Sequence, residues 1–263
     1  MILEINGISF TYNSHNVLKD LSFRTSNGEL LAVLGPNGVG KSTLLKCLNA
    51  ILQPREGSVM VDGRETDSMD PMEIARHFGY VAQNQQATRM TAFDAVLLGR
   101  RPHIRWKVAN EDIEIVDAAM KRIGLTHLSL RYIDQMSGGE LQKVAIARAL
   151  VQEPELMLLD EPTSSLDLKN QVEIMNLIRR VVNEHSVAVI MTMHNLNMAL
   201  RYAHKYLFLK DGSIYSAGNI NEITGSMIEA VYGIPVELVY HKGNPFIIPL
   251  EKDLKGDKEC LVR

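Results

Sequence analysis

The chain is poor in cysteine, with only Cys47 and Cys260 in 263 residues. So sparse a pair gives no disulfide framework and no cysteine-based metal cluster, and it favours a reducing compartment. Long apolar runs are also lacking: the runs at 30–34 and 187–191 fall far short of the about 20 residues that a spanning helix needs. The first residues lack the basic and apolar regions of a secretory signal. We therefore expect any membrane role to come through a partner chain.

A strong charge of either sign is absent too. The 28 Lys and Arg residues against 31 Asp and Glu residues give a net charge of -3. This balance offers no general electrostatic reason to bind nucleic acid, so we expect no nucleic-acid partner. The 8 histidines show no metal-ligand spacing, which argues against a structural metal. A hydrophobic content of 46% indicates a soluble globular protein.

Apolar runs that end at polar loops predict an α/β core. The run 30–34 ends at a glycine-rich loop, and residues 41–50 follow with helical composition. Two more apolar runs, 156–159 and 187–193, flank an amphipathic stretch at 171–182. Parallel strands joined by a crossover helix have this pattern, so we expect a buried parallel sheet.

Between these runs, helical periodicity replaces strand patterns, from about residue 84 to 155. Asn110 is a candidate cap for an amphipathic helix there. One face of that helix is expected to carry Ile113, Val116, Met120 and Ile123. Two further segments, Thr91 to Asp94 and Ser137 to Glu140, fit the capping box that begins a helix. The region is interpreted as an inserted helical subdomain.

The last third of the chain carries one clear turn. Asp211-Gly212 lies between short apolar runs and predicts an antiparallel hairpin. Beyond Gly218 the pattern weakens to a short helix around 227–232, a strand-like stretch, and a charged tail at 251–259.

The glycine-rich loop fits G-x-x-x-x-G-K-[ST], the pattern of a phosphate-binding loop. Glycines let successive backbone amides converge on phosphate oxygens, and the helix that follows adds its positive dipole end. Lys41 supplies a cation for the β and γ phosphates, and the Ser42 hydroxyl is placed to ligate Mg²⁺. The alternative is a glycine-rich turn with a surface lysine. The expected nucleotide-binding residues of the loop are Gly35, Pro36, Asn37, Gly38, Val39, Gly40, Lys41, Ser42 and Thr43.

Polar residues after the two later strands complete the expected chemistry. Asp160 ends an apolar strand, where a carboxylate would hold Mg²⁺ through water, and Glu161 beside it would polarise the attacking water. His194 follows the next strand, within reach of a γ phosphate. Acid pairs after strands are common, and a lone histidine is more often structural. The functional assignment of these residues therefore depends on the other motifs in the same chain.

With Ser137-Gly138-Gly139-Glu140 added, these motifs resemble the nucleotide-binding subunits of ATP-binding cassette (ABC) transporters over nearly the whole chain. The segment 137–140 is similar to that family's signature sequence. The resemblance implies a P-loop NTPase (RecA-like) core with an antiparallel β appendage and an inserted helical subdomain. It divides the chain into core (1–88), helical subdomain (89–156), second half of the core (157–217) and C-terminal extension (218–263). Met136 replaces a leucine, and Asn195 stands where aspartate is frequent.

The resemblance also implies further site residues. Tyr12 would stack on adenine, and Gln83 would sense Mg²⁺ and the γ phosphate. The residues expected at the Mg²⁺ site are therefore Ser42, Gln83 and Asp160. In that family the signature of one subunit covers ATP held by the other, so two copies would sandwich two ATP molecules head to tail. The residues expected to bind nucleotide in trans are Ser137, Gly138, Gly139 and Glu140. Those expected to communicate across the interface are Ser165, Leu166 and Asp167.

A complete ATPase without a spanning segment suggests a motor for two permease subunits on other chains, served indirectly by an extracytoplasmic substrate-binding protein. The subunit would lie in the cytoplasm, on the inner face of the membrane, with permease helices docked near 83–90 and the helical insert. Residues 96–103 and 232–236 resemble the subfamily that imports iron siderophores, haem and cobalamin. Four alternatives stay open: an importer of molybdate or tungstate, an exporter subunit, a soluble ABC ATPase of cluster assembly, translation or repair, and a small-molecule kinase.

The only tryptophan, Trp106, lies between Arg105 and Lys107. It suggests stacking on a base or a contact with a membrane edge. Packing on the helical insert is the preferred interpretation.

Overall fold

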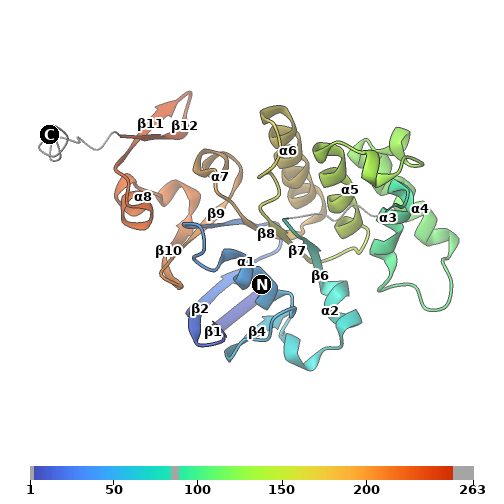
Figure 1. Cartoon of the computed structure of the whole chain (residues 1–263), viewed down its shortest axis with the longest axis horizontal. Helices are drawn as coiled ribbons and strands as arrows, with labels where there is room; N and C mark the ends of the chain where they lie inside the picture. Colours follow the sequence, from blue (N-terminus) through green and yellow to red (C-terminus); the bar gives the residue numbers. More distant parts are fainter. Residues whose placement is uncertain (1–2, 84–88, 251–263) are drawn as a thin grey trace, which may run out of the picture.

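The computed structural model describes residues 3–83 and 89–250 (Figure 1). The expected charged tail at 251–259, Cys260 and most of the expected permease groove at 83–90 lie outside these residues. Among the described residues, every helix is too short or too polar to cross a lipid bilayer.

A six-stranded sheet in the order β10-β9-β3-β8-β7-β6 forms the centre of the molecule. β3, β6, β7, β8 and β9 run parallel, because β3 pairs in parallel with β8 and β9, and β7 with β6 and β8. The predicted pair of parallel strands and their crossover helix is confirmed. The strands are β3 (Leu30–Leu34), β6 (Phe78–Val81), β7 (Leu156–Asp160), β8 (Ala188–Thr192), β9 (Lys205–Lys210) and β10 (Ser213–Asn219), and the crossover helix is α6 (Leu168–His185).

The predicted hairpin at Asp211-Gly212 is confirmed as well. Both residues adopt left-handed backbone angles, with φ of 51° and 81°, as a tight two-residue turn requires. The turn adds β10 antiparallel to β9 at one edge of the sheet.

An antiparallel sheet in the order β2-β1-β4-β5 packs against the central sheet. Its apolar side chains share a core with α1 and with one face of the central sheet, including Leu31 and Val33. Figure 1 shows α1 beside these strands. α1 is thus fixed from both sides. The elements are β1 (Leu3–Tyr12), β2 (His15–Thr25), α1 (Lys41–Leu48), β4 (Glu56–Val61) and β5 (Arg64–Glu65), followed by α2 (Pro71–His77).

Helices dominate from residue 89 to 155, as expected. The described residues there contain no strand, only an isolated bridge between Thr91 and Tyr132. Thr91 caps α3 (Ala92–Leu97), and Ser137 caps α5 (Gly138–Leu150), so both predicted capping boxes begin helices. Figure 1 shows these helices at the side of the sheet away from β10.

Two details of α4 (Asn110–Ile123) correct the sequence interpretation. Asn110 is the first helical residue rather than the cap, because the amide of Ala109 donates to Asp112 Oδ2 at 3.0 Å and closes the helix start there. Ile113 is 40% exposed, whereas Val116 and the two later residues of the expected face are buried. The apolar face therefore begins one turn later than the periodicity suggested.

The C-terminal extension forms α8 (Gly225–Tyr232) and a hairpin of β11 (Val236–His241) and β12 (Asn244–Pro249). The hairpin is tied to α7 (Leu196–Tyr202), since the Ile247 amide donates to the Asn197 side chain at 2.7 Å. The expected short helix and strand-like stretch are both present.

Candidate nucleotide site

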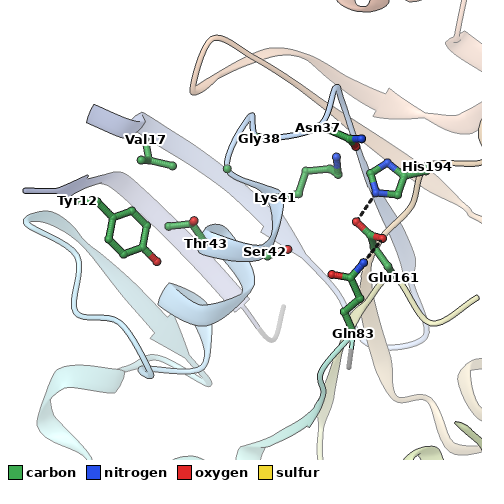
Figure 2. A pocket seen from close by; sticks show the side chains of 11 residues that line it. Tyr12, Val17, Asn37, Gly38, Lys41, Ser42, Thr43, Gln83, Glu161 and His194 are labelled. Atoms are coloured by element: carbon green, nitrogen blue, oxygen red, sulfur yellow. Dashed lines mark hydrogen bonds and ion pairs between the residues drawn. The ribbon is translucent and has the colours of Figure 1, made fainter. Parts of the chain in front are cut away.

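A pocket of about 450 Å³ opens where β3, β7 and β8 end. Its walls come from segments far apart in the sequence, which the parallel sheet brings to one edge (Figure 2). Ten of its eleven lining residues are among those expected from the sequence. They are Tyr12, Asn37, Gly38, Gly40, Lys41, Ser42, Thr43, Gln83, Glu161 and His194, joined by Val17.

The glycine-rich loop between β3 and α1 needs glycine where it touches its neighbours. A Cβ on Gly35 would lie 2.5 Å from the Leu209 carbonyl oxygen, and one on Gly40 would lie 2.8 Å from Leu18 Cδ2. Gly40 also has a φ of 108° and precedes α1 without a side chain. The first amides of α1 are therefore left open to an anion in the pocket.

Lys41 is buried within this loop. Its Nζ donates to the carbonyl oxygens of Gly35 at 2.8 Å and Pro36 at 2.9 Å. Burial lowers the pKa of Lys41, and the carboxylates of Glu161 and Asp160 oppose that shift. The ammonium is therefore held at the glycine-rich loop that lines the pocket, where it would attract phosphate.

Asp160 is 4% exposed and held by two hydroxyls. Its Oδ1 accepts from Ser42 Oγ at 2.9 Å and from Thr192 Oγ1 at 2.7 Å. A hydroxyl and a carboxylate are hard oxygen ligands of the kind that Mg²⁺ prefers. These residues fit a magnesium ion shared with a nucleotide. Within the described residues, no three His, Cys, Asp or Glu side chains cluster as an alternative metal site.

Glu161 lies between the other two expected catalytic residues. Gln83 Nε2 donates to Glu161 Oε2 at 2.6 Å, and His194 Nε2 contacts Oε1 (Figure 2). Its backbone amide donates to Thr192 Oγ1 at 2.9 Å. Glu161 adopts a left-handed φ of 49°, which is costly for a residue with a Cβ and persists only where neighbours hold it. The carboxylate is therefore fixed toward the pocket.

The signature segment lies elsewhere in the same chain. Ser137 caps α5, and its amide and hydroxyl both donate to Glu140 Oε2 at 2.8 Å. These bonds hold the pKa of Glu140 below its usual range. None of the four signature residues is among the described residues that line the phosphate pocket. The start of α5 therefore does not belong to the pocket that contains Lys41.

The expected interface residues lie beside the signature. A smaller hollow of about 170 Å³ is lined by Gly138, Ser165 and Leu166, together with Gln83 and Glu161. Asp167 caps α6, because its side chain accepts from the Asn170 amide at 2.8 Å. Glu161 therefore contributes to the phosphate pocket on one side and to the hollow beside the signature on the other.

Three residues at the site were not singled out from the sequence. Thr192 ends the apolar strand β8, where its hydroxyl positions both acids. Val17 lines the pocket from β2. The hydroxyl of Tyr232, in α8, is buried near the backbone of Gly35, and burial raises the pKa of Tyr232 to about 12. Only Thr192 could have been found from the sequence, because it is a polar residue at the end of an otherwise apolar strand.

Asn195, the departure from the family pattern, has a local role. Its side chain accepts from the Met198 amide at 3.1 Å and caps α7. Asparagine performs this capping as well as aspartate does, so His194 keeps a fixed backbone.

Comparison with known proteins identifies the family of the chain. The family described as ABC transporter matches residues 18–164. An uncharacterised ABC transporter ATP-binding protein of Methanocaldococcus jannaschii is 48% identical, over 95% of this chain and 98% of its own. The ferric enterobactin transport ATP-binding protein of Escherichia coli is 36% identical, over 92% of each. A solved inward-facing metal-chelate type ABC transporter superposes with a TM-score of 0.84 at 31% identity, covering 95% of this chain and 97% of that one. The chain belongs to the ABC transporter family and is one of its ATP-binding subunits.

Proposed function

We propose that this chain is the ATP-hydrolysing motor that drives import of a metal chelate through separate permease subunits. The observation that carries the proposal is the convergence of Lys41, Asp160, Glu161, Gln83 and His194 in one pocket. A small-molecule kinase would share the phosphate loop, but it would leave the signature helix start without a role.

Each residue has a role that follows from its position. Lys41 and the first amides of α1 bind the β and γ phosphates of ATP. Ser42 and Asp160 hold Mg²⁺ together with Gln83, and the ion, when bound, neutralises charge on the phosphates. Tyr12, 45% exposed at the mouth of the pocket, offers a ring face for adenine.

Glu161 is the candidate base for hydrolysis. Its carboxylate lies at the pocket between Gln83 and His194, where it can orient a water molecule and accept its proton as that water attacks the γ phosphate. His194 is placed to donate to the γ phosphate oxygens. The contacts with Gln83 and His194 hold the carboxylate in this position.

A second copy would complete the site. The amides at the start of α5 form an anion site, yet they lie outside the phosphate pocket of their own chain. Two copies related by a twofold axis would place Ser137 to Glu140 of each over the ATP of the other. ATP would then hold the dimer together, and hydrolysis would release it.

The cargo class and location rest on likeness. The Escherichia coli relative is named for ferric enterobactin transport, and the solved neighbour is of metal-chelate type. We therefore favour a metal chelate over an oxyanion as the cargo, and a transport role over a soluble role in cluster assembly. This function would place the subunit on the inner face of the membrane. A substrate-binding protein would deliver the cargo from the other side.

The test is ATP hydrolysis by the purified chain, alone and reconstituted with its cognate permease. We expect the permease to raise the rate, and its substrate-binding protein with bound chelate to raise it further. Glu161→Gln should abolish hydrolysis, while the control Glu237→Gln, an exposed acid of β11, should not. A rate indifferent to the permease would contradict a transport role.

A further inference from the structure

A loop at residues 101–109, between α3 and α4, presents the only tryptophan of the chain. Trp106 is 98% exposed, so the preferred sequence interpretation, packing on the helical insert, is wrong. Leaving a whole indole in water forgoes the burial of a large apolar surface. The neighbouring Val108 is 41% exposed as well.

The same loop is cationic. It carries Arg101, Arg105 and Lys107, all exposed, and no Asp or Glu occurs between residues 101 and 109. Within the described residues, none of these three cations forms an ion pair with a carboxylate. The loop therefore carries a local charge of opposite sign to the net charge of -3 of the whole chain.

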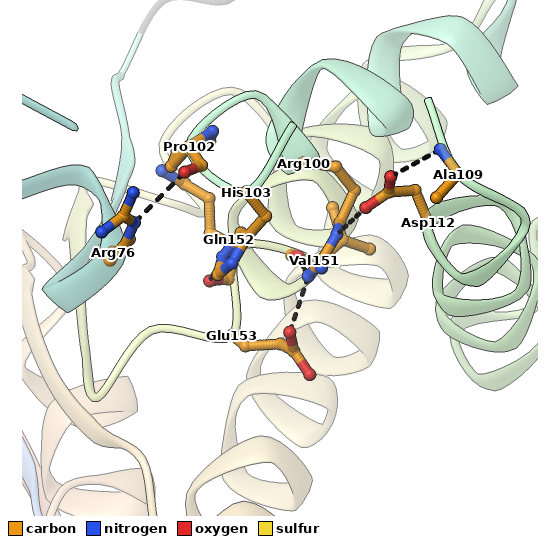
Figure 3. Close-up of polar contacts among 9 residues, drawn as sticks. All are labelled: Arg76, Arg100, Pro102, His103, Ala109, Asp112, Val151, Gln152 and Glu153. Atoms are coloured by element: carbon orange, nitrogen blue, oxygen red, sulfur yellow. Dashed lines mark hydrogen bonds and ion pairs between the residues drawn. The ribbon is translucent and has the colours of Figure 1, made fainter. Parts of the chain in front are cut away.

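Buried polar contacts fix both ends of this loop (Figure 3). Arg100, which precedes it, is 5% exposed. Its guanidinium donates to Asp112 Oδ1 at 3.0 Å, to the Val151 carbonyl at 2.7 Å and to Glu153 Oε2 at 2.6 Å. Asp112 in turn accepts from the amide of Ala109, the last residue of the loop, at 3.0 Å. One buried ion pair thus closes the loop at its base.

Two further contacts hold its first half. The Pro102 carbonyl accepts from Arg76 Nε of α2 at 3.2 Å, and His103 Nε2 hydrogen-bonds the Gln152 carbonyl at 2.9 Å (Figure 3). The loop is therefore anchored on α2, α4 and the end of α5, while Trp106 at its tip makes no such contact with the described part of the chain. A fixed base and a bare aromatic tip indicate a surface that meets a partner.

We propose that loop 101–109 binds the anionic phospholipid headgroups of the membrane beside the permease. An indole ring is most favourably placed at the boundary between headgroups and acyl chains, and each Arg or Lys near an anionic surface adds attraction. Protein interfaces are also enriched in tryptophan and arginine, but three exposed cations on one short loop complement an anionic surface, which favours lipid headgroups. The proposal rests on the proposed function, which brings the chain to a membrane.

The single tryptophan makes a direct test available. The full chain, without nucleotide, is mixed with vesicles of neutral phosphatidylcholine or of phosphatidylcholine with phosphatidylglycerol, and Trp106 fluorescence is recorded. We expect emission to move to shorter wavelength only with the anionic vesicles, and to be quenched when bromine is placed on the upper acyl chain. High salt should reverse both effects, because the attraction is screened.

Charge-matched variants separate this loop from general electrostatics. Arg105→Gln with Lys107→Gln should weaken vesicle binding roughly 30-fold. The control, Arg24→Gln with Lys121→Gln, removes two exposed cations elsewhere and should leave binding nearly unchanged. Trp106→Phe, followed by vesicle co-sedimentation, should weaken binding without changing ATP hydrolysis in solution.

Two results would overturn the proposal: emission unchanged by anionic vesicles, or a shift that appears only with detergent-solubilised permease, which would identify a protein partner. Neither depends on ATP hydrolysis. A failure of the proposed motor function would therefore show in the rate assay and not in these spectra.

Discussion

Replacing Thr192 by valine removes one hydroxyl that positions both acids of the site. Thr192 is fully buried, and valine keeps its shape. The change removes the bond to the Asp160 carboxylate and leaves the Glu161 amide without its acceptor. A hydrogen bond to a charged group contributes about 1.5–3 kcal/mol, and an unsatisfied buried donor costs about 1–3 kcal/mol. We expect a loss of about 3 kcal/mol of unfolding free energy.

In a chain of this size that loss lowers Tm by about 6–12 °C. It should also lower kcat, because Asp160 and the strained backbone of Glu161 lose a shared support. The measurements are calorimetric unfolding and steady-state ATP hydrolysis. Thr192→Ser is the control, since it keeps the hydroxyl and loses one methyl, at a cost of about 1 kcal/mol. A valine variant as stable and as active as the serine variant would refute this reasoning.

Three further changes test other parts of the account. Gly138→Ala adds a Cβ at an exposed position of the signature, with only Leu166 Cδ2 nearby at 3.6 Å; it should keep Tm, as alanine favours a helix, but slow hydrolysis by obstructing the nucleotide of a second copy, and a rate equal to wild type would count against trans binding. Because its bonds to Ser137 depress the pKa of Glu140, the cap of α5 is present above the usual 4.5 and lost as pH falls through the lowered value; exchange of the Ser137 and Glu140 amides should rise only there, and not in Glu140→Ala, which lacks the titrating group. Arg100→Met leaves a buried carboxylate unpaired and should cost about 3–5 kcal/mol in calorimetry, with ATP affinity retained; an unchanged Tm would show that the ion pair is dispensable.

The core around the phosphate loop is predictable from sequence because its signals are local. A five-residue apolar run, a glycine loop and a helical stretch follow one another directly, and so do the strand, acids and crossover helix at 156–182. The turn at Asp211-Gly212 is equally local, since its residues alone tolerate the backbone angles required.

The antiparallel sheet that backs α1 is not predictable in the same way. β1 pairs with β4 across about fifty residues, so no short window contains the pattern. The role of Thr192 is hidden for a similar reason, because its partners Asp160 and Glu161 lie on a neighbouring strand. The buried position of Tyr232 near Gly35 likewise depends on how the C-terminal extension folds back.

The apolar periodicity of the sequence also failed to predict which side chains are exposed to solvent. Ile113 fits the apolar face of α4 by spacing, yet it is 40% exposed in the first turn of that helix. The exposure of Trp106 depends on the closure of its loop by Arg100 and Asp112. The burial of that pair is established only in the folded chain.

The most direct test of the shared-site mechanism is the mass of Glu161→Gln measured by light scattering with and without Mg-ATP. We expect a 29.4 kDa monomer without nucleotide and twice that mass with Mg-ATP, because ATP stays bound and unhydrolysed between two copies. Glu237→Gln, which still hydrolyses ATP, should dimerise only transiently. A Glu161→Gln chain that binds Mg-ATP and remains at 29.4 kDa would contradict the claim that each signature acts on the nucleotide of a second copy.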